Sequence, residues 1–171
     1  MEILSRSIAT LIFILLLPFI LIISVISLLL QGSPIFFKQK RIGYNFKSFN
    51  ILKFRTMVNN SGDFITKSND NRVTFLGRLL RKTKIDEIPQ LLNIIRGEMR
   101  FIGPRPEVEE YFKKQKFQFL KNIKPGISDY SSIIFRNEAE ILNNIGGNDP
   151  YRKLLPIKLA TPAPVPLVLV L

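Results

Sequence analysis

The sequence contains neither cysteine nor histidine among its 171 residues. These absences exclude disulfides, thiolate nucleophiles, imidazole bases and the usual zinc sites. Any catalysis must therefore use carboxylates, hydroxyls, lysine or arginine. A metal that serves such chemistry would be a hard, oxygen-bound ion, and Mg²⁺ fits that description.

Acidic residues are also scarce, since 13 of them face 25 basic residues and leave a formal net charge of +12. Such an excess favours an anionic partner, and three classes fit it: nucleic acid, anionic lipid headgroups and phosphorylated small molecules. Charge alone does not choose among the three.

Charge is missing altogether from residues 8–30, an almost unbroken apolar run with one proline, Pro18. As a helix, this run is long enough to cross the hydrocarbon core of a bilayer, which is about 30 Å thick. Pro18 removes a backbone donor at its middle, so we expect a bend there. Basic residues flank both ends, with Arg6 before the run and 38–41 after it, as expected if both ends stay cytoplasmic. The residues alone leave open a kinked span and a re-entrant helix that enters and leaves by the same face.

Residues 31–160 predict one compact domain of the α/β class, mostly helical with a small β-hairpin. Apolar periodicity and turn residues predict strands at 35–39 and 46–54 around a turn at 43–45, a loop at 58–72, an amphipathic helix suited to a membrane surface at 73–82, helices at 85–95 and 106–120, an extended segment at 127–135 and a helix at 137–144. Residues 161–171 alternate proline with small apolar residues and resemble an added or replaced end rather than part of the domain.

Two adjacent acids open the helix expected at 85–95. Asp86 is a natural N-cap there, and Lys82 and Lys84 together with the helix N-terminus should keep its carboxylate ionised. An ionised carboxylate is able to attack phosphorus and form an acyl phosphate, while Glu87 points about 100° away around the helix and is free to hold Mg²⁺, as a metal pair with Asp86. The alternative is an ordinary capping pair without catalytic function.

An arginine between two prolines follows, Arg105 in the segment 103–106. The prolines fix the backbone, and a guanidinium binds phosphate through two parallel hydrogen bonds. Further candidates for phosphate contacts are Arg41, Lys53, Arg55 and Arg136. Each of these alone has the simpler interpretation of a solvated basic side chain, so only their combination with the acid pair points to a site.

These features together resemble the monotopic phosphoglycosyl transferases, the bacterial sugar transferase family that starts glycan assembly on a polyprenol carrier. The resemblance covers about residues 5–160. It rests on the apolar N-terminus with its proline and on five blocks in order: 32–43 (GSPIFFKQKRIG), 53–57 (KFRTM), 85–91 (IDEIPQL), 103–106 (GPRP) and 124–127 (KPGI).

The resemblance implies transfer of a sugar 1-phosphate from a UDP-sugar to undecaprenyl phosphate through a covalent aspartyl-phosphosugar intermediate. This reaction is the first membrane step in the synthesis of a capsule, O-antigen or glycoprotein glycan. It maps the nucleophile to Asp86, the residue beside Mg²⁺ to Glu87 and the proline-flanked arginine to Arg105. It also favours a re-entrant helix over residues 1–30 that breaks at Pro18, with the domain on the cytoplasmic face of the inner membrane. The expected partners are membrane lipids and the two substrates, not nucleic acid; the oligomeric state is open, and a dimer is one option.

The chain departs from the family pattern at three places. Leu17 stands where the family often has serine before the helix-breaking proline, so the break must form without that hydroxyl. Residues 128–136 replace a segment that often reads GWAQVNGR, although Arg136 keeps its register, and this change implies a different sugar preference. The tail at 161–171 replaces further helical sequence.

Two rival functions fit part of the pattern. A membrane-tethered nucleic-acid-binding protein would use the basic excess and the 14 phenylalanines for backbone contacts and stacking. It would require aromatics interleaved with arginines on an exposed sheet, whereas most phenylalanines here fall at positions typical of a core. A non-catalytic membrane scaffold would explain the apolar helix and the basic surface but not the acid pair or Arg105.

Overall fold

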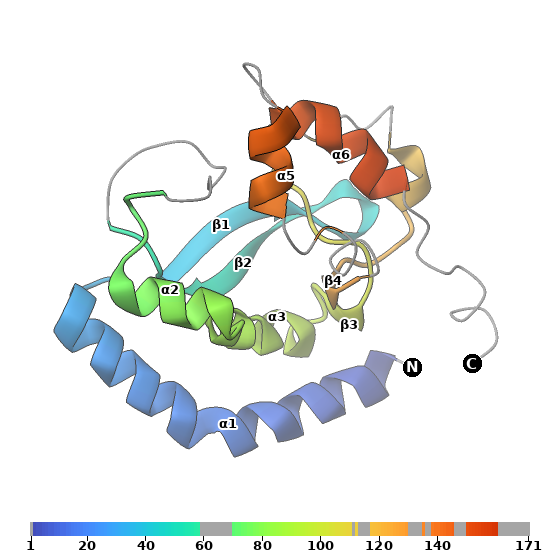
Figure 1. Ribbon diagram of the computed structural model, residues 1–171. Helices are drawn as coiled ribbons and strands as arrows, with labels where there is room; N and C mark the ends of the chain where they lie inside the picture. The colour runs from blue at the N-terminus through green and yellow to red at the C-terminus, as the bar shows by residue number, and fades with distance from the viewer. Residues whose placement is uncertain are drawn as a thin grey trace.

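The computed structural model describes residues 2–58, 70–110, 112, 117–129, 135, 138–145 and 150–160. Among these residues the chain is mostly helical, with two small sheets of two strands each. Figure 1 shows the sheets and the short helices stacked above one long N-terminal helix. The predicted α/β class, mostly helical with a small β-hairpin, is therefore confirmed for these residues.

The N-terminal helix α1 spans Glu2–Gln31 and includes Pro18. The helix continues through Pro18 without interruption, and Figure 1 shows its two halves meeting at a bend near the middle. Its mean hydropathy of 3.1 and its length would suffice to cross a membrane. The predicted bend is therefore confirmed, whereas a full break into two helices is not seen.

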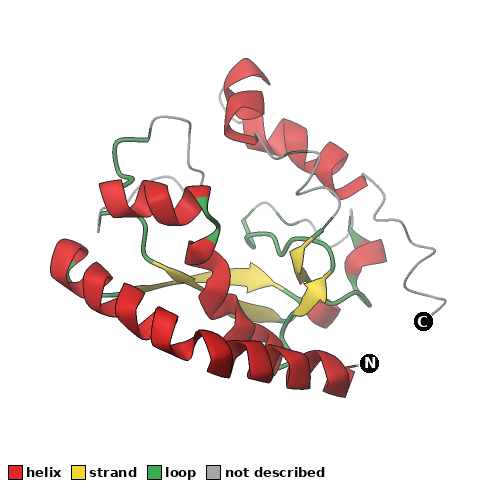
Figure 2. Cartoon of the chain, turned by 60° about the horizontal axis from the view of Figure 1, so that its bottom comes forward, coloured by secondary structure: helices red, strands yellow, loops and turns green. Residues whose placement is uncertain are grey.

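One side of α1 packs against the domain along its whole length, as Figure 2 shows from below. Ala9 is fully buried against α3, and Ile20 and Ile23 pack against Leu80 of α2. Most other apolar side chains of α1 are exposed, Leu15 and Leu29 among them. Because the domain covers only one stripe of the helix, a wide apolar surface is left over.

The β-hairpin consists of β1 (Phe36–Ile42) and β2 (Ser48–Phe54), which pair antiparallel with Phe36 opposite Phe54 and Ile42 opposite Ser48. A short 3-10 turn, η1 (Tyr44–Phe46), joins them. The hairpin prediction is confirmed, although β1 extends three residues further than expected. Ile51, Leu52 and Phe54 of β2 are buried, so this strand carries the hairpin's contribution to the core.

Helix α2 (Phe75–Lys82) follows, and the hydroxyl of Thr74 caps it by accepting a hydrogen bond from the Gly77 amide at 2.9 Å. This confirms the amphipathic helix predicted at 73–82. Its apolar residues divide between two sides, since Leu80 is buried while Phe75 is 83% exposed. A large exposed aromatic beside basic residues is typical of a helix at a membrane surface.

The segment that carries the acid pair differs from the prediction of one helix over 85–95. It forms a 3-10 helix, η2 (Ile85–Gln90), followed by a short α-helix, α3 (Leu91–Ile95). The residue at the N-cap position is Lys84, in the left-handed conformation with φ 60°, and Asp86 lies inside η2. The predicted N-cap role of Asp86 is therefore wrong. Gly97, with φ 77°, ends α3 as expected.

The helix predicted at 106–120 is wrong for the residues described. Only a short 3-10 helix, η3 (Gln118–Leu120), lies there. The carbonyls of Pro106 and Glu107 accept hydrogen bonds from Arg41 and from the Ile42 amide, at 3.1 and 2.9 Å. Because β1 uses these carbonyls, they are not available to start a helix.

A second sheet pairs β3 (Arg100–Ile102) with β4 (Gly126–Ser128) in parallel. Gly103 and Gly126 let the two strands approach, since a Cβ on Gly126 would lie 2.2 Å from the Gly103 amide nitrogen. Strand β4 confirms the start of the extended segment predicted at 127–135. Strand β3 was not predicted, because three residues are too short for a periodic signal.

Helices α5 (Glu138–Ile145) and α6 (Pro150–Ala160) complete the described fold. The first confirms the helix predicted at 137–144, and the second was not predicted. Leu142, Leu154 and Leu155 from the two helices form a separate small core together with Phe117. Three predictions lie outside the described residues: most of the loop at 58–72, the position of Arg136 and the tail at 161–171.

Candidate active site

The centre of the candidate site is the acid pair on η2. Asp86 is only 6% exposed, and its Oδ1 is buried without a hydrogen-bond partner among the described residues. A buried carboxylate oxygen without a partner is costly, so such atoms in native structures need an explanation. A catalytic role and the binding of an ion are two accepted explanations.

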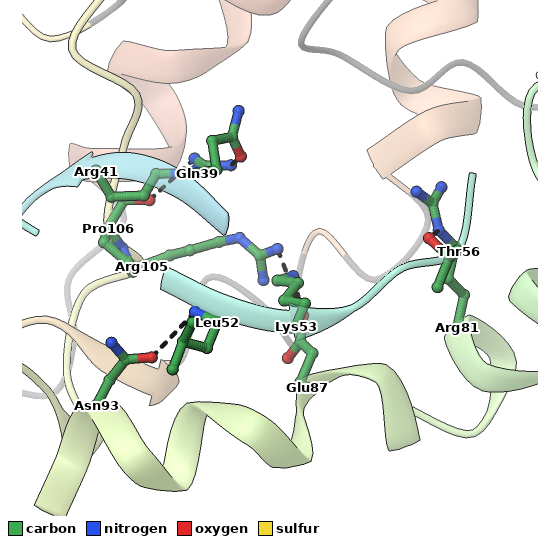
Figure 3. Close-up of polar contacts among 10 residues, drawn as sticks. All are labelled: Gln39, Arg41, Leu52, Lys53, Thr56, Arg81, Glu87, Asn93, Arg105 and Pro106. Carbon is green, nitrogen blue, oxygen red and sulfur yellow. Dashed lines mark hydrogen bonds and ion pairs between the residues drawn. The ribbon is translucent and has the colours of Figure 1, made fainter. Parts of the chain in front are cut away.

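Glu87 lies next to two cations from other parts of the chain, as Figure 3 shows. Lys53 of β2 donates a hydrogen bond to Glu87 Oε1 at 2.7 Å, and Arg105 Nη2 lies 3.7 Å from the same oxygen. The three side chains come from β2, η2 and the loop after β3. The structure thus gathers Lys53 and Arg105 at Glu87, and Asp86 adjoins this cluster through its neighbour Glu87 and the charge of Lys53. All four were predicted as site residues.

Electrostatic effects differ between the members of this cluster. Burial alone would raise the pKa of Glu87, but Lys53 and Arg105 outweigh it and hold that pKa below its usual range. Burial lowers the pKa of Lys53, and Arg105 adds to this effect while Glu87 opposes it. Burial would also lower the pKa of Arg105, yet Glu87 and Glu107 reverse the direction. Glu87 is therefore a stable anion between two cations.

Asp86 behaves in the opposite way. Burial raises its pKa above the usual value, and the attraction of Lys53 only partly offsets this effect. The expectation that Lys82, Lys84 and a helix N-terminus keep this carboxylate readily ionised is therefore corrected. The reason is structural: Asp86 is inside a 3-10 turn and desolvated, rather than at a solvated helix start.

The loop that carries Arg105 is fixed on both sides. The Arg105 amide donates to Asp129 Oδ2 at 3.0 Å, and the Pro104 carbonyl accepts from the Gly126 amide at 3.0 Å. Arg41 donates to the Pro106 carbonyl at 3.1 Å. Arg41 was predicted as a phosphate contact; in the structure it lies beside the loop, where its guanidinium binds the Pro106 carbonyl and Gln39 Oε1. Its role in binding phosphate stays a prediction.

A buried pair supports this loop from α6. Tyr151 donates a hydrogen bond to Glu107 Oε2, and both residues are less than a tenth exposed. Burial raises the pKa of Tyr151, and Glu107 raises it further. The charge of Glu107 attracts both Arg41 and Arg105. Helix α6 is therefore connected to the candidate site through one hydroxyl and one carboxylate.

Arg55 has a different position from the one predicted. Its guanidinium binds the carbonyls of Gln31, Gly32 and Ser33, and so it fastens the end of α1 to β2. This use explains its burial and takes up most of its donors. The remaining predicted contact, Arg136, is outside the described residues.

The sequence did not single out several residues that shape the site. Arg81 attracts Asp86 and donates to Thr56 Oγ1 at 2.8 Å. Asn93, fully buried, donates to the Asn50 carbonyl and accepts from the Leu52 amide, which fixes η2 and α3 against β2. Asn93 stands within the apolar segment Leu91–Ile95. Because a buried amide needs hydrogen-bond partners, this position could have indicated such a contact from the sequence.

The acid pair was tested as a place for Mg²⁺. The described residues contain no group of three carboxylates, histidines or cysteines able to surround a metal. Mg²⁺ commonly binds through one or two carboxylates and completes its shell with water and substrate phosphates. The partnerless Asp86 Oδ1 and the adjacent, anionic Glu87 fit this kind of site.

A buried acid beside converging cations, on a domain with a long apolar helix, is the arrangement expected of a membrane-associated protein that handles phosphorylated substrates. The family described as "Bacterial sugar transferase" matches residues 2–153 of this sequence. The chain therefore belongs to that family, which confirms the resemblance found in the sequence.

Similar proteins include the exopolysaccharide production protein ExoY of Rhizobium meliloti, 34% identical over a region that covers 88% of this chain and 74% of the relative. Another is the UDP-glucose:undecaprenyl-phosphate glucose-1-phosphate transferase of Escherichia coli, 35% identical over 80% of this chain. A third is the UDP-N-acetylgalactosamine-undecaprenyl-phosphate N-acetylgalactosaminephosphotransferase of Aeromonas hydrophila, 37% identical over 72% of this chain. The match spans only 32% and 31% of the latter two relatives.

Proposed function

We propose that this protein moves a sugar 1-phosphate from a UDP-sugar to undecaprenyl phosphate and so initiates the assembly of a glycan. The observation that carries the proposal is the buried Asp86, whose Oδ1 has no partner among the described residues. Lys53 and Glu87 act on its charge, and Arg105 lies against the neighbouring Glu87. Two of the relatives are named for both a UDP-sugar and undecaprenyl phosphate, which supports this choice of donor and carrier.

The first step is an attack of an Asp86 carboxylate oxygen on the β-phosphorus of the UDP-sugar. A bond forms between this oxygen and phosphorus, the bond from phosphorus to the bridging oxygen breaks, and UMP leaves with that oxygen. The raised pKa of Asp86 reflects a poorly solvated carboxylate, which is a stronger nucleophile than a well-hydrated one.

The second step transfers the phosphosugar to the carrier. A phosphate oxygen of undecaprenyl phosphate attacks the same phosphorus, the bond to Asp86 breaks, and the carboxylate returns to its starting state. Lys53 and Arg105 lie close to Glu87 beside the attacking residue, where their charges stabilise the oxygens of the transferred group.

Asp86 and Glu87 would hold Mg²⁺ together with the donor diphosphate, and the ion would supply additional neutralisation of phosphate charge. In that state Lys53 would share Glu87 with the metal or turn towards the donor. Arg105 keeps its place in either case, because its backbone is held by Asp129 and by the neighbouring prolines.

The proposed membrane arrangement is supported by α1. Both of its halves pack against the same domain: Ala9 against α3, and Ile20 and Ile23 against Leu80 of α2. A helix that crossed the bilayer would carry one end away from the domain. We therefore infer a re-entrant helix that bends at Pro18, with the domain on the cytoplasmic face of the inner membrane.

The test is UMP release and lipid-linked product formation by the full chain in lipid nanodiscs, with undecaprenyl phosphate and a panel of UDP-sugars. Asp86→Asn, which keeps the shape but removes the nucleophile, should lose transfer while retaining its place in the membrane. Chelation of Mg²⁺ should stop the reaction, and re-addition should restore it. Absence of transfer with every donor, or full activity of Asp86→Asn, would overturn the proposal.

A further inference from the structure

We propose that the N-terminal end of α1 and the β3–β4 sheet form a binding site for the phosphate headgroup of an anionic phospholipid. Three cations define this headgroup site: Arg6, Arg100 and Lys124. The site lies away from the acid pair, and the inference does not depend on the transfer chemistry.

Two of the cations converge on one oxygen. Lys124 Nζ lies 2.8 Å and Arg100 Nη2 lies 3.3 Å from Glu2 Oε1. The two come from different elements, since Arg100 is on β3 and Lys124 precedes β4. Such convergence is the geometry that an anionic oxygen of a ligand requires, and Glu2 itself is 46% exposed and able to move aside.

The third cation adds charge that Glu2 does not balance. The guanidinium of Arg6 lies against the backbone at Gly97, where a Cβ would come within 1.8 Å of Nη2. Among the described residues the Arg6 side chain makes no hydrogen bond or ion pair. The nearby acid Glu98 is already bound to Asn93 at 2.7 Å. Three cations therefore face one carboxylate, which favours a further anion.

A small cavity connects these groups. Its lining includes Glu2, Ser5, Arg6, Gly97, Arg100 and Lys124. The Ser5 hydroxyl provides a neutral donor at the same place. Ile94 and Met99 complete the lining, so the cavity is partly apolar. Its side chains that donate hydrogen bonds to phosphate oxygens are those of Ser5, Arg6, Arg100 and Lys124.

The rim of the headgroup site is apolar. Ile102 is 75% exposed and lies two residues from Arg100 on β3, so both side chains point to the same side of the strand. Ile3, next to Glu2 on α1, is 82% exposed. A charged site with exposed aliphatic neighbours fits a lipid, whose headgroup and chains meet such surfaces together. Free phosphate or nucleic acid would gain nothing from this rim.

Continuity with α1 identifies the source of the lipid as the bilayer that takes up this helix. Figure 1 shows β3 beside the N-terminal end of α1, whereas α2 lies near the other end. With the exposed Phe75 on α2 and Ile102 on β3, the domain would touch the membrane at both ends of the helix.

The experiment uses the absence of tryptophan from the chain. Ile102→Trp places a single reporter at the rim in the detergent-solubilised full chain, and Ile157→Trp places a control reporter on α6. Short-chain phosphatidylglycerol or phosphatidylcholine is then titrated. We expect a saturable blue shift of the rim reporter with the anionic lipid and none from the control reporter.

Adding Arg6→Gln and Lys124→Gln to the chain with the rim reporter should raise the half-saturating lipid concentration about 25-fold, or about fivefold per cation. Lys124→Gln alone should raise it about fivefold. Lys153→Gln on α6, which also removes one positive charge, is the matched control for Lys124→Gln and should leave the half-saturating concentration unchanged.

Three outcomes would overturn the inference. Equal responses to the two lipids would show that charge is not recognised. A weakening by Lys153→Gln as large as that by Lys124→Gln alone would show that net charge rather than this site is responsible. Displacement of the anionic lipid by millimolar inorganic phosphate, beyond the effect of sodium chloride at the same ionic strength, would assign the site to free phosphate.

Discussion

Two clusters in this protein have the same composition but different surroundings. In the first, Glu87 lies between Lys53 and Arg105, and the Glu87 side chain is 13% exposed. In the second, Glu2 lies between Arg100 and Lys124, and the Glu2 side chain is 46% exposed. Each of these ion-pair groups has one acid and two cations, and what distinguishes them is the access of solvent to the acid, since the cations are exposed to similar extents.

Solvent decides what each cluster is able to do. Charges that are shielded from water interact strongly and shift the pKa values of their neighbours, as seen at Glu87, Lys53 and Asp86. Charges at the surface are screened by water and salt and exchange partners easily. The buried cluster is therefore suited to catalysis, and the exposed cluster to reversible contact with lipid headgroups.

The largest expected effect comes from removing a cation of the buried cluster. Arg105→Met should lower the rate of transfer about 100-fold, because a desolvated guanidinium that stabilises the transferred phosphate is lost. Arg105→Lys retains the charge without the planar fork, so its rate of transfer should lie between those of the unmodified chain and Arg105→Met. Initial rates in nanodiscs measure this effect. A loss of twofold or less for Arg105→Met would place the phosphate elsewhere.

The second expected effect is on pH dependence. Lys53→Met removes an attraction that lowers the pKa of Asp86, so this already raised pKa should rise further. Attack requires the carboxylate, so at a given acidic pH less of the variant is active and the acid limb of the rate profile moves to higher pH. Single-turnover rates across pH would measure it.

Lys47→Met, an exposed residue on the same hairpin, is the control for this shift. Its profile should match that of the unmodified chain. An acid limb of Lys53→Met that stays in place, or moves to lower pH, would contradict the assignment of Asp86 as the titrating nucleophile.

A smaller effect is expected from the support behind Arg105. Tyr151→Phe removes only the hydroxyl that binds Glu107, so the loop should become less well positioned. Loss of one buried hydrogen bond to a charged group predicts a roughly tenfold rise in KM for the donor with kcat little changed. Tyr44→Phe, at an exposed tyrosine, is the matched control. A fall in kcat alone would argue against a positioning role.

The smallest effect belongs to the exposed cluster. Glu2→Gln should change the free energy of unfolding by no more than about 0.5 kcal/mol, and added salt should remove the difference, since exposed ion pairs contribute little. Denaturant titration in detergent at low and high salt measures this change. A loss of 2 kcal/mol or more, insensitive to salt, would mean that the two clusters are alike after all.

Much of the local structure could be predicted from the sequence. The apolar helix, the hairpin and α2 each have a periodic pattern or turn residues that act within a few positions, and these predictions are confirmed. The site residues Lys53, Asp86, Glu87 and Arg105 also come together. Basic residues around an acid pair were a sufficient signal for that cluster.

The errors have a common cause, which is tertiary contact. Proline and three glutamates favoured a helix at 106, but β1 takes the carbonyls of Pro106 and Glu107 and α6 takes the Glu107 side chain. Aspartate is a residue type common at N-caps, yet Lys84, whose backbone is in the left-handed conformation, begins the 3-10 helix η2, and Asp86 is buried inside it. Partners more than 40 residues apart in the chain leave no trace in a local pattern.

The central claim is that Asp86 carries the phosphosugar. The most direct measurement is the mass of the peptide containing Asp86 after the full chain meets the UDP-sugar that it uses, without undecaprenyl phosphate. We predict that this peptide gains the mass of one sugar phosphate and loses it when the carrier is added, whereas Asp86→Asn gains none. A preparation that transfers sugar phosphate but shows no adduct, or shows it on another residue, would contradict the account.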